Sequence, residues 1–194
     1  MKGIEQAIRN LNTLSKSMVP RATAQSLNRV AGRAISRSTK LVAKDVRVQQ
    51  KLIRQRARLR RASAEQNPPR ATLSINRGNL PAIKLGAARV QLSRRVGFVG
   101  KQGSFVGKQG SVLKIGCYTF RHAFIQKLAN GRWHVMRRVG RSRYPIEVVK
   151  IPLVTPLTKA FQEETRRLLE TDMGKEMGYA LKNQLRLYLT RKIG

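Results

Sequence analysis

Residues 123–161 read AFIQKLANGRWHVMRRVGRSRYPIEVVKIPLVTPLTKAF, and this stretch decides the fold. It contains two apolar-rich runs, AFIQKL and RWHVMRRV, on either side of Ala129, Asn130 and Gly131. Asn-Gly between such runs predicts a β-hairpin, because a tight type I′ turn needs a positive φ at both central residues. The stretch therefore begins with two paired antiparallel strands.

The second half of the stretch predicts a third strand and a helix. Residues 146–151 are apolar on both faces, as in a strand that is covered on one side and forms an edge on the other. Thr155 offers a helix N-cap, and Pro156 suits the first helical position, where its missing N–H loses no hydrogen bond. We therefore expect a strand, a sharp turn and a helix after the hairpin.

Apolar residues at helical spacing mark both ends of the chain. A first helix is expected to end by Pro20, because a proline disfavours helix in the residue before it. A second helix carries an apolar stripe from Leu27 to Val42, and two further helices meet near Asp172. The last helix has a stripe for packing on the sheet or on a neighbouring subunit, formed by Met177, Leu181, Leu185 and Leu189.

The middle of the chain reads as short strands separated by turns. After a short helix from about Gln49, strands are expected at 56–62, 71–75, 89–95 and 112–118. Between the last two strands, FVGKQGS at 98–104 is repeated letter for letter at 105–111. Duplication in a tolerant loop explains the repeat. The alternative is a functional loop whose glycines let backbone N–H groups approach phosphate.

Together these patterns predict an α+β fold. N-terminal helices precede a central, mainly antiparallel sheet with a long glycine-rich hairpin loop, and C-terminal helices pack on the sheet. We expect a single domain across residues 1–194. Its parts are a helical basic region at 1–62, a sheet region at 63–154 with a flexible loop at 97–111, and C-terminal helices at 155–194.

Charge is the dominant feature of the composition. The chain has 41 Lys and Arg against 9 Asp and Glu, a formal net charge of +32, and residues 66–146 contain no acidic residue. Self-repulsion of this size favours a polyanionic partner, whereas a well-solvated surface does not need charges of nearly one sign. Aromatic residues make up only 5% of the chain, so base stacking and sequence-specific readout are not expected.

Basic side chains in three regions are the candidate contacts to nucleic-acid phosphates. They lie in the arginine-rich run near Ala57, beside and within the repeated loop, and after the Asn-Gly turn. Such contact would be independent of base sequence and sensitive to salt. The candidates are Arg54, Arg56, Arg58, Arg60, Arg61, Arg94, Arg95, Lys101, Lys108, Arg137, Arg138, Arg141 and Arg143.

No pattern in the sequence points to catalysis, a metal or a cofactor. Cys117, His122 and His134 match no zinc-binding spacing. A nuclease needs clustered carboxylates to hold Mg²⁺, but the acidic residues of the C-terminal part have the spacing of a helix surface. We therefore do not expect an enzyme. The sequence also shows no apolar run long enough to cross a membrane and no secretory signal.

Several strings resemble one known family. NGRWHVMRRV and RYPIEVVKIPLVTPLTKAF, together with GIEQAIRNLNTLSK, NRGNLPAIKLG and GYALKNQLRL, are similar to the minor tail protein Z family, the tail completion proteins of lambda-like tailed phages. The similarity runs along nearly the whole chain and is weakest in the glycine-rich centre. None of these strings is a catalytic signature.

The resemblance implies a structural protein of the virion that is assembled in the host bacterial cytoplasm. It would act at the head-proximal end of the tail, complete the tail for joining to the head, and help to seat the genome end. Expected partners are the tail terminator, tail tube, tape-measure protein and head–tail connector, and phage DNA bound nonspecifically, with no membrane. The alternative is a basic nucleic-acid-binding protein of ribosomal or nucleoid type, which leaves the C-terminal stripe and acidic cluster poorly explained.

We also expect a ring-forming homo-oligomer in the assembled tail. Acidic residues of the C-terminal helices would meet the basic body of a neighbouring copy. The candidate subunit contacts are Glu163, Glu164, Glu170 and Glu176.

Overall fold

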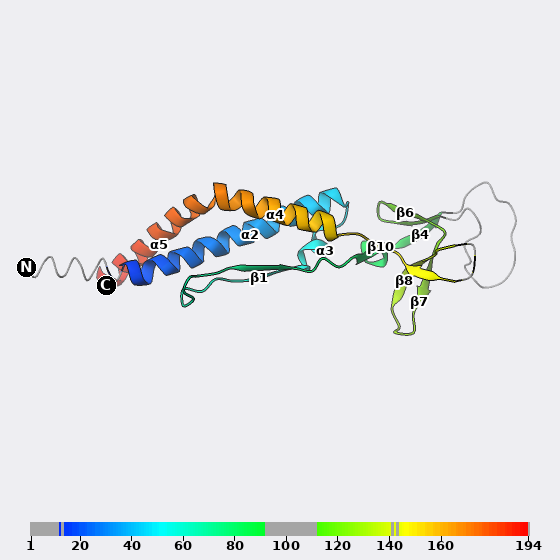
Figure 1. Cartoon of the computed structure of the whole chain (residues 1–194), viewed down its shortest axis with the longest axis horizontal. Helices are drawn as coiled ribbons and strands as arrows, with labels where there is room; N and C mark the ends of the chain where they lie inside the picture. Colours follow the sequence, from blue (N-terminus) through cyan, green and yellow to red (C-terminus); the bar gives the residue numbers. More distant parts are fainter. Residues whose placement is uncertain (1–11, 13, 92–111, 141, 143, 194) are drawn as a thin grey trace, which may run out of the picture. The chain divides into compact units, whose positions relative to one another are not determined.

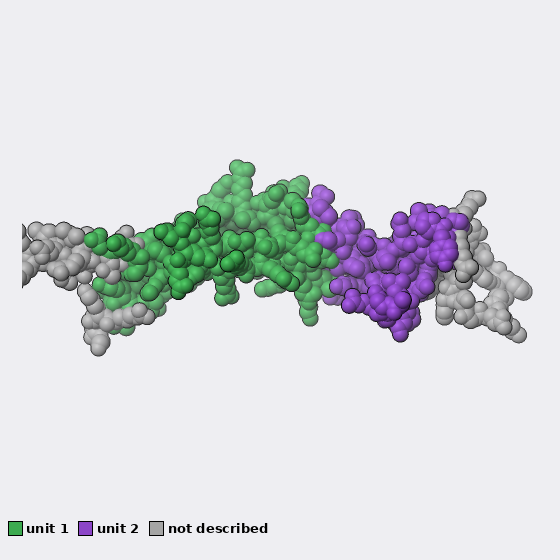
Figure 2. Space-filling view, turned by 60° about the horizontal axis from the view of Figure 1, so that its bottom comes forward, with its two compact units in different colours: residues 1–46, 50–77, 156–194 green, residues 47–49, 78–155 purple. Residues whose placement is uncertain are grey.

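A computed structural model describes residues 12, 14–91, 112–140, 142 and 144–193. Contacts between residues group the chain into two compact units (Figure 2). Unit 1 contains residues 1–46, 50–77 and 156–194, and unit 2 contains residues 47–49 and 78–155. The first part of the helix expected to end by Pro20, which includes Ile4, Ala7, Ile8 and Leu11, and the repeated FVGKQGS sequence lie outside the described residues. The single domain expected from the sequence stays a prediction.

Long helices form the framework of unit 1 (Figure 1). α2 (Val19–Asp45) follows directly on a π-helical turn, η1 (Leu14–Met18). Pro20 lies in the first turn of α2, as expected, because its missing N–H loses no intrahelical bond there. The boundary predicted near Pro20 is therefore a change of helix type, and the helical backbone continues through it.

The two C-terminal helices lie against α2. They are α4 (Val154–Thr171) and α5 (Met173–Ile193). Val30 and Ala34 of α2 pack with Leu168 of α4, and the half-buried Met173 of α5 covers the same cluster. α4 begins at Val154, so Thr155 lies in its first turn and does not precede the helix as a cap.

The leucines of the predicted α5 stripe are exposed, whereas Met177 of the same stripe is half-buried. Leu181, Leu185 and Leu189 are 38%, 45% and 49% exposed. The residues that α5 buries are instead Ala180 and Glu176. Because these leucines are exposed, the described residues do not bury the row on a sheet, and a neighbouring subunit stays its predicted partner.

Unit 1 also contains the predicted short helix and a hairpin. Their bounds are α3 (Gln50–Arg54), β1 (Ala57–Arg60) and β2 (Thr72–Ile75). β1 and β2 pair antiparallel, with Ala57 opposite Ile75 and Arg60 opposite Thr72. Half-buried and exposed residues alternate along both strands, so each strand has one inner and one outer face.

Unit 2 contains three small antiparallel sheets, in the orders β4–β5–β6, β7–β8–β9 and β3–β10. Its elements are β3 (Leu80–Pro81), the 3₁₀ helix η2 (Ala82–Leu85), β4 (Ala88–Gln91), β5 (Val112–Ile115), β6 (Tyr118–Arg121), β7 (Ala123–Lys127), β8 (Trp133–Arg138), β9 (Ile146–Val148) and β10 (Lys150–Ile151). Its buried cluster is Ala82, Leu113, Ile115, Ala123 and Val135. The α+β class with antiparallel pairing and helices at both ends is confirmed, but the strands divide among four small sheets.

Two segments predicted as single strands are each divided in two. The expected strand at 112–118 forms β5 and β6, which are separated by a turn in which Gly116 has a φ of 58°. The expected strand at 146–151 forms β9 and β10. Val149, between them, donates its N–H to Val135 O and accepts a hydrogen bond from Ala82 N, so the chain changes partners at this residue.

The hairpin of β7 and β8 is confirmed, but its predicted type I′ turn is wrong. Leu128 N donates to Arg132 O and Gly131 N donates to Leu128 O, so the connection is longer than a two-residue turn. Gly131 has a φ of 74°, whereas Asn130 is not among the described residues with a positive φ. Asn130 Oδ1 instead accepts from Arg132 N. This pattern is typical of a three-residue loop that ends in a left-handed glycine.

The predicted long hairpin connection is confirmed at its two ends. Gln91 of β4 is opposite Val112 of β5 in an antiparallel pair. Residues 92–111 therefore connect two neighbouring strands, and this connection includes the whole repeated sequence.

Candidate nucleic-acid interface

β1 presents two arginines on the exposed face of its hairpin. Arg58 and Arg60 alternate with half-buried residues, and they are opposite a serine and a threonine of β2. Arg54, at the end of α3, and Arg61, just after β1, are also exposed. Within the described part of the chain, none of these four arginines has an ion-pair partner. Their charge is therefore available to a ligand.

Arg56 differs from these neighbours because it is half-buried. Its backbone N–H donates to Ile53 O and its carbonyl accepts from Asn76 N, so it joins α3 to the hairpin. Burial lowers the pKa of the Arg56 guanidinium from its ordinary value. A guanidinium remains charged at neutral pH all the same, so Arg56 adds to the local positive field while exposing less surface to a partner.

A side-chain amide of α2 fixes the end of β1. Asn28 Nδ2 donates to Ala62 O at 2.9 Å, and Asn28 Oδ1 accepts from Ala62 N at 2.8 Å. Ala62 is buried, so both of its backbone groups depend on these bonds. α2 therefore holds in place the segment that carries Arg60 and Arg61.

A second basic face lies on the β4–β5–β6 sheet and was not among the predicted sites. Arg89 of β4 is directly opposite Lys114 of β5, which is opposite Thr119 of β6. Arg121 is two residues beyond Thr119 and so lies on the same face. Arg89, Lys114 and Arg121 are all exposed. The signal in the sequence was the single lysine between two apolar residues of β5.

Like charges opposite each other in a sheet oppose its formation. The Arg89–Lys114 pair is therefore destabilising relative to neutral neighbours. The three strands contain no carboxylate that would offset this repulsion. A phosphate group between the two side chains would replace repulsion with attraction. This face is therefore suited to a polyanion.

The other predicted contacts divide into two groups. Arg137 is directly opposite Glu147 of β9, and the Arg138 guanidinium lies 6.0 Å from the ring centre of Phe124. These two arginines therefore have partial partners within the chain. The second group, Arg94, Arg95, Lys101, Lys108, Arg141 and Arg143, lies outside the described residues.

Three arginines of α2, Arg29, Arg33 and Arg37, form ion pairs inside unit 1. Glu176 of α5 is 4% exposed and lies 3.3 Å from Arg29 and 2.6 Å from Arg33. Asp172 lies 3.2 Å from Arg33. A hydrogen bond from the Thr171 hydroxyl, together with the nearby arginines, lowers the pKa of Asp172. These three arginines therefore stabilise the helix packing, and their carboxylate partners reduce what they can contribute to a DNA-binding face.

The four glutamates predicted as subunit contacts fall into two groups, one buried and one exposed. Glu164 is 9% exposed and pairs with an arginine of its own helix, and Glu176 is buried against α2. Both are occupied within their own chain. Glu163 is exposed, and the Glu170 side chain keeps 64% of its surface exposed while it pairs with Arg166. The predicted contact to a neighbouring copy would therefore depend on Glu163 and Glu170.

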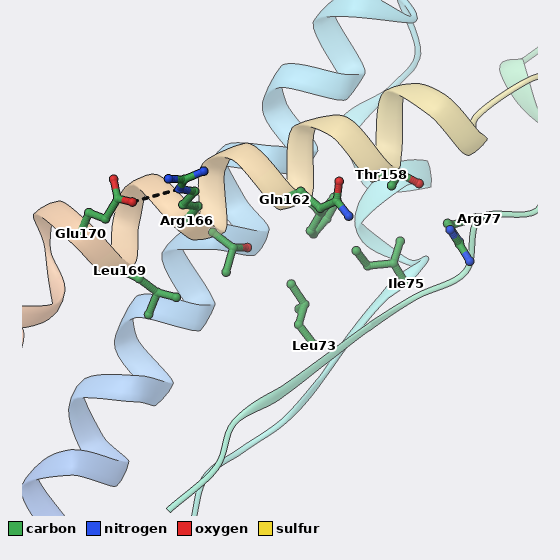
Figure 3. Close-up of a pocket in the computed structure, with 10 residues that line it drawn as sticks. Leu73, Ile75, Arg77, Thr158, Gln162, Arg166, Leu169 and Glu170 are labelled. Atoms are coloured by element: carbon green, nitrogen blue, oxygen red, sulfur yellow. Dashed lines mark hydrogen bonds and ion pairs between the residues drawn. The ribbon is translucent and has the colours of Figure 1, made fainter.

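An apolar groove separates α4 from the β1–β2 hairpin (Figure 3). Its volume is about 710 Å³. Leu73 and Ile75 of β2 line one side, and Phe161 and Leu169 of α4 line the other. Glu170 also lines the groove together with its ion-pair partner Arg166 and with Arg77, so apolar surface and charged side chains of both signs lie together.

No group of three or more His, Cys, Asp or Glu side chains in the described part of the chain is arranged to hold a metal ion. The described helices were also compared with the length and hydropathy that a membrane span requires. None of them meets both requirements.

Comparison with known proteins places the chain in one family. The prophage minor tail protein Z family matches residues 1–191. The tail completion protein of Escherichia phage N15 is 59% identical over 191 residues, which is 98% of this chain and 99% of the relative. Tail completion protein Z of Escherichia phage lambda is 52% identical over 192 residues, which is 98% of this chain and 99% of the relative. No solved structure matches the chain. The chain therefore belongs to the prophage minor tail protein Z family of structural phage tail proteins.

Proposed function

We propose that this protein completes the tail at its head-proximal end and contacts the DNA there without sequence preference. Its tail role is supported by the family match along residues 1–191. Its DNA contact is supported by the fact that some of its basic side chains have carboxylate partners within the chain and others do not. Arg29, Arg33 and Arg37 of α2 have carboxylate partners, whereas the basic side chains on the outer faces of β1 and of the β4–β6 sheet have none among the described residues.

The observation that supports the DNA contact is this difference between arginines with and without carboxylate partners. A fold that needed its arginines only for internal packing would pair them, as α2 does with α5. Exposed and unpaired arginines on strands instead add repulsion, and a polyanion removes it. The alternative of a ribosomal or nucleoid protein unrelated to tails explains the same charge, but the family match argues against it.

A second copy of this chain is the partner that we propose for the apolar groove. The exposed leucines of α5 provide an apolar row of matching character, and α5 after Glu176 carries only basic charges. Glu163 and Glu170 provide exposed negative charge on the α4 side. Insertion of one copy's α5 into the next copy's groove is a head-to-tail contact, which closes into a ring if the rotation fits. A map of an assembled tail in which every copy leaves the groove open to solvent would contradict this proposal.

DNA binding across a salt series tests the proposed contact. We expect the logarithm of affinity to fall linearly with the logarithm of salt concentration, equally for two unrelated duplexes. Replacing Arg89, Lys114 and Arg121 together by Gln should reduce the slope by roughly 0.9 for each phosphate that the variant no longer neutralises. Filter binding measures both quantities.

A matched variant controls for charge alone. Lys159, Lys175 and Lys182 are exposed on α4 and α5, and their replacement by Gln removes the same three charges. We expect this control to keep nearly the whole salt slope. Equal losses in the two triple variants, or an affinity that does not change with salt, would contradict the assignment of the sheet face.

A further inference from the structure

A polar pocket lies beside the hairpin in unit 1, where β1 ends and β2 begins. Its volume is about 450 Å³. Arg60 of β1 and Thr72 of β2 lie opposite each other in the strand register and belong to its lining. The connecting segment supplies the other lining residues, which are Gln66, Asn67, Pro68 and Arg70.

The lining of this pocket has the chemistry of an anion site. It contains two guanidinium groups, two side-chain amides and a hydroxyl, and it contains no carboxylate. Arg60 and Arg70 have no ion-pair partner among the described residues. Guanidinium forks match the geometry of phosphate oxygens and form strong, charge-assisted hydrogen bonds to them.

One lining residue also has a buried polar atom without a partner. Gln66 Oε1 is buried and finds no hydrogen-bond partner among the described residues. Such atoms are rare in folded proteins, and an ion or water that completes the site is one explanation. An amide oxygen accepts hydrogen bonds, so only the NH₂ group of Gln66 can donate to an anion in the pocket.

The pocket is also held in a fixed place. Asn28 of α2 forms two hydrogen bonds with Ala62, which follows the pocket residue Arg60 by two positions. On the other side, the pairing of Arg60 with Thr72 fixes the start of β2. Preorganised donors bind a ligand at a smaller entropic cost than donors on a free loop.

We propose that this pocket binds a single phosphate group and that, in the assembled tail, the group is a phosphodiester of the DNA backbone. The second half of this statement rests on the proposed function, whereas the first does not. The pocket therefore differs from the open basic face of the β4–β6 sheet. The pocket would bind one phosphate group, whereas the open face would lie along several phosphates of a DNA backbone.

Two double variants of the full-length protein test the pocket. Arg60→Gln with Arg70→Gln removes both guanidinium groups of the pocket. Arg58→Gln with Arg61→Gln removes two exposed charges of the same segment that do not line the pocket. Both doubles change only exposed side chains, and matching melting temperatures would show that both are folded.

Inorganic phosphate is the first probe. We expect saturable shifts of the Gln66 and Asn67 side-chain amide signals in NMR spectra of the wild type and of the Arg58/Arg61 double variant. The Arg60/Arg70 double variant should bind at least about tenfold more weakly, because it loses both charge-assisted contacts. Equal weakening in both doubles, or an acidic peptide that shifts these signals more strongly than phosphate, would overturn the proposal.

A short DNA duplex is the second probe and separates the two halves of the proposal. We expect the Arg60/Arg70 variant to lose more DNA affinity than the Arg58/Arg61 variant, although both lose two charges. If the wild type binds phosphate but DNA affinity falls equally in both double variants, the phosphodiester assignment is wrong and the assignment of an anion site stands. If the wild type binds phosphate but not DNA, the proposed function fails and the pocket does not.

Discussion

Glu176 shows how a carboxylate of the C-terminal helices is used inside the chain. Its side chain is 5% exposed and lies between Arg29 and Arg33 of α2, which are each about half exposed. A buried carboxylate needs such partners, because an ionised group without hydrogen bonds is costly to remove from water. The sequence showed the acidic spacing of a helix surface, but it could not show that α2 lies against this face.

Replacing Glu176 by Gln should destabilise unit 1. The change keeps the shape of the side chain but removes the charge that holds two guanidinium groups, and we expect a loss of about 1–3 kcal/mol in the free energy of unfolding. Urea denaturation followed by circular dichroism measures this loss, since urea does not screen charges.

Glu170→Gln is the matched control for this residue. Glu170 pairs with Arg166 one turn away on the same helix, and its side chain is 64% exposed. Exposed ion pairs at this spacing contribute about 0.3–0.5 kcal/mol to the free energy of unfolding, so the control should lower it by no more than this amount. Equal losses in the two variants would contradict the role assigned to Glu176.

At the scale of elements, the sequence predicted the strands better than their connections. Alternation and helical periodicity correctly predicted α2, α3, β1, β2, β7, β8 and the two C-terminal helices. Periodicity does not show where a strand changes partner, so the breaks at Gly116 and Val149 were missed. The same limit applies to the basic face of the β4–β6 sheet, because register alone brings Arg89 opposite Lys114.

Two glycine substitutions test the element assignments in opposite directions. Gly131→Ala places a side chain at a φ of 74°, where nothing crowds the added atom, and should destabilise by about 1–2 kcal/mol through backbone strain alone. Gly178→Ala adds a methyl group in open space on α5 and should stabilise by about 0.8–1 kcal/mol. Thermal unfolding measures both shifts. The same sign for both substitutions would contradict one of the two backbone assignments.

The same pair of variants addresses the domain organisation. Gly131 belongs to unit 2 and Gly178 to unit 1. If the chain is the single cooperative domain expected from the sequence, both substitutions shift one common transition. If each substitution shifts a separate transition, the two units unfold independently and the single-domain prediction is wrong.

At the scale of the whole molecule, charge indicated the class of partner but not the surface. The net charge of +32 favoured a polyanion from composition alone. Counting arginines could not distinguish Arg29, Arg33 and Arg37 of α2, which are paired internally, from the arginines of β1, which face outward. This difference depends on which helix packs on which, and only the three-dimensional structure supplies it.

A density map of an intact tail joined to its head tests the central claim most directly. We predict that copies of this chain form a ring at the head-proximal end, with the outer faces of β1 and of the β4–β6 sheet toward the DNA. In such a ring, each groove of α4 and β2 is filled by α5 of a neighbour. A chain placed at the far end of the tail, or basic faces covered by acidic protein and away from the DNA, would contradict the account.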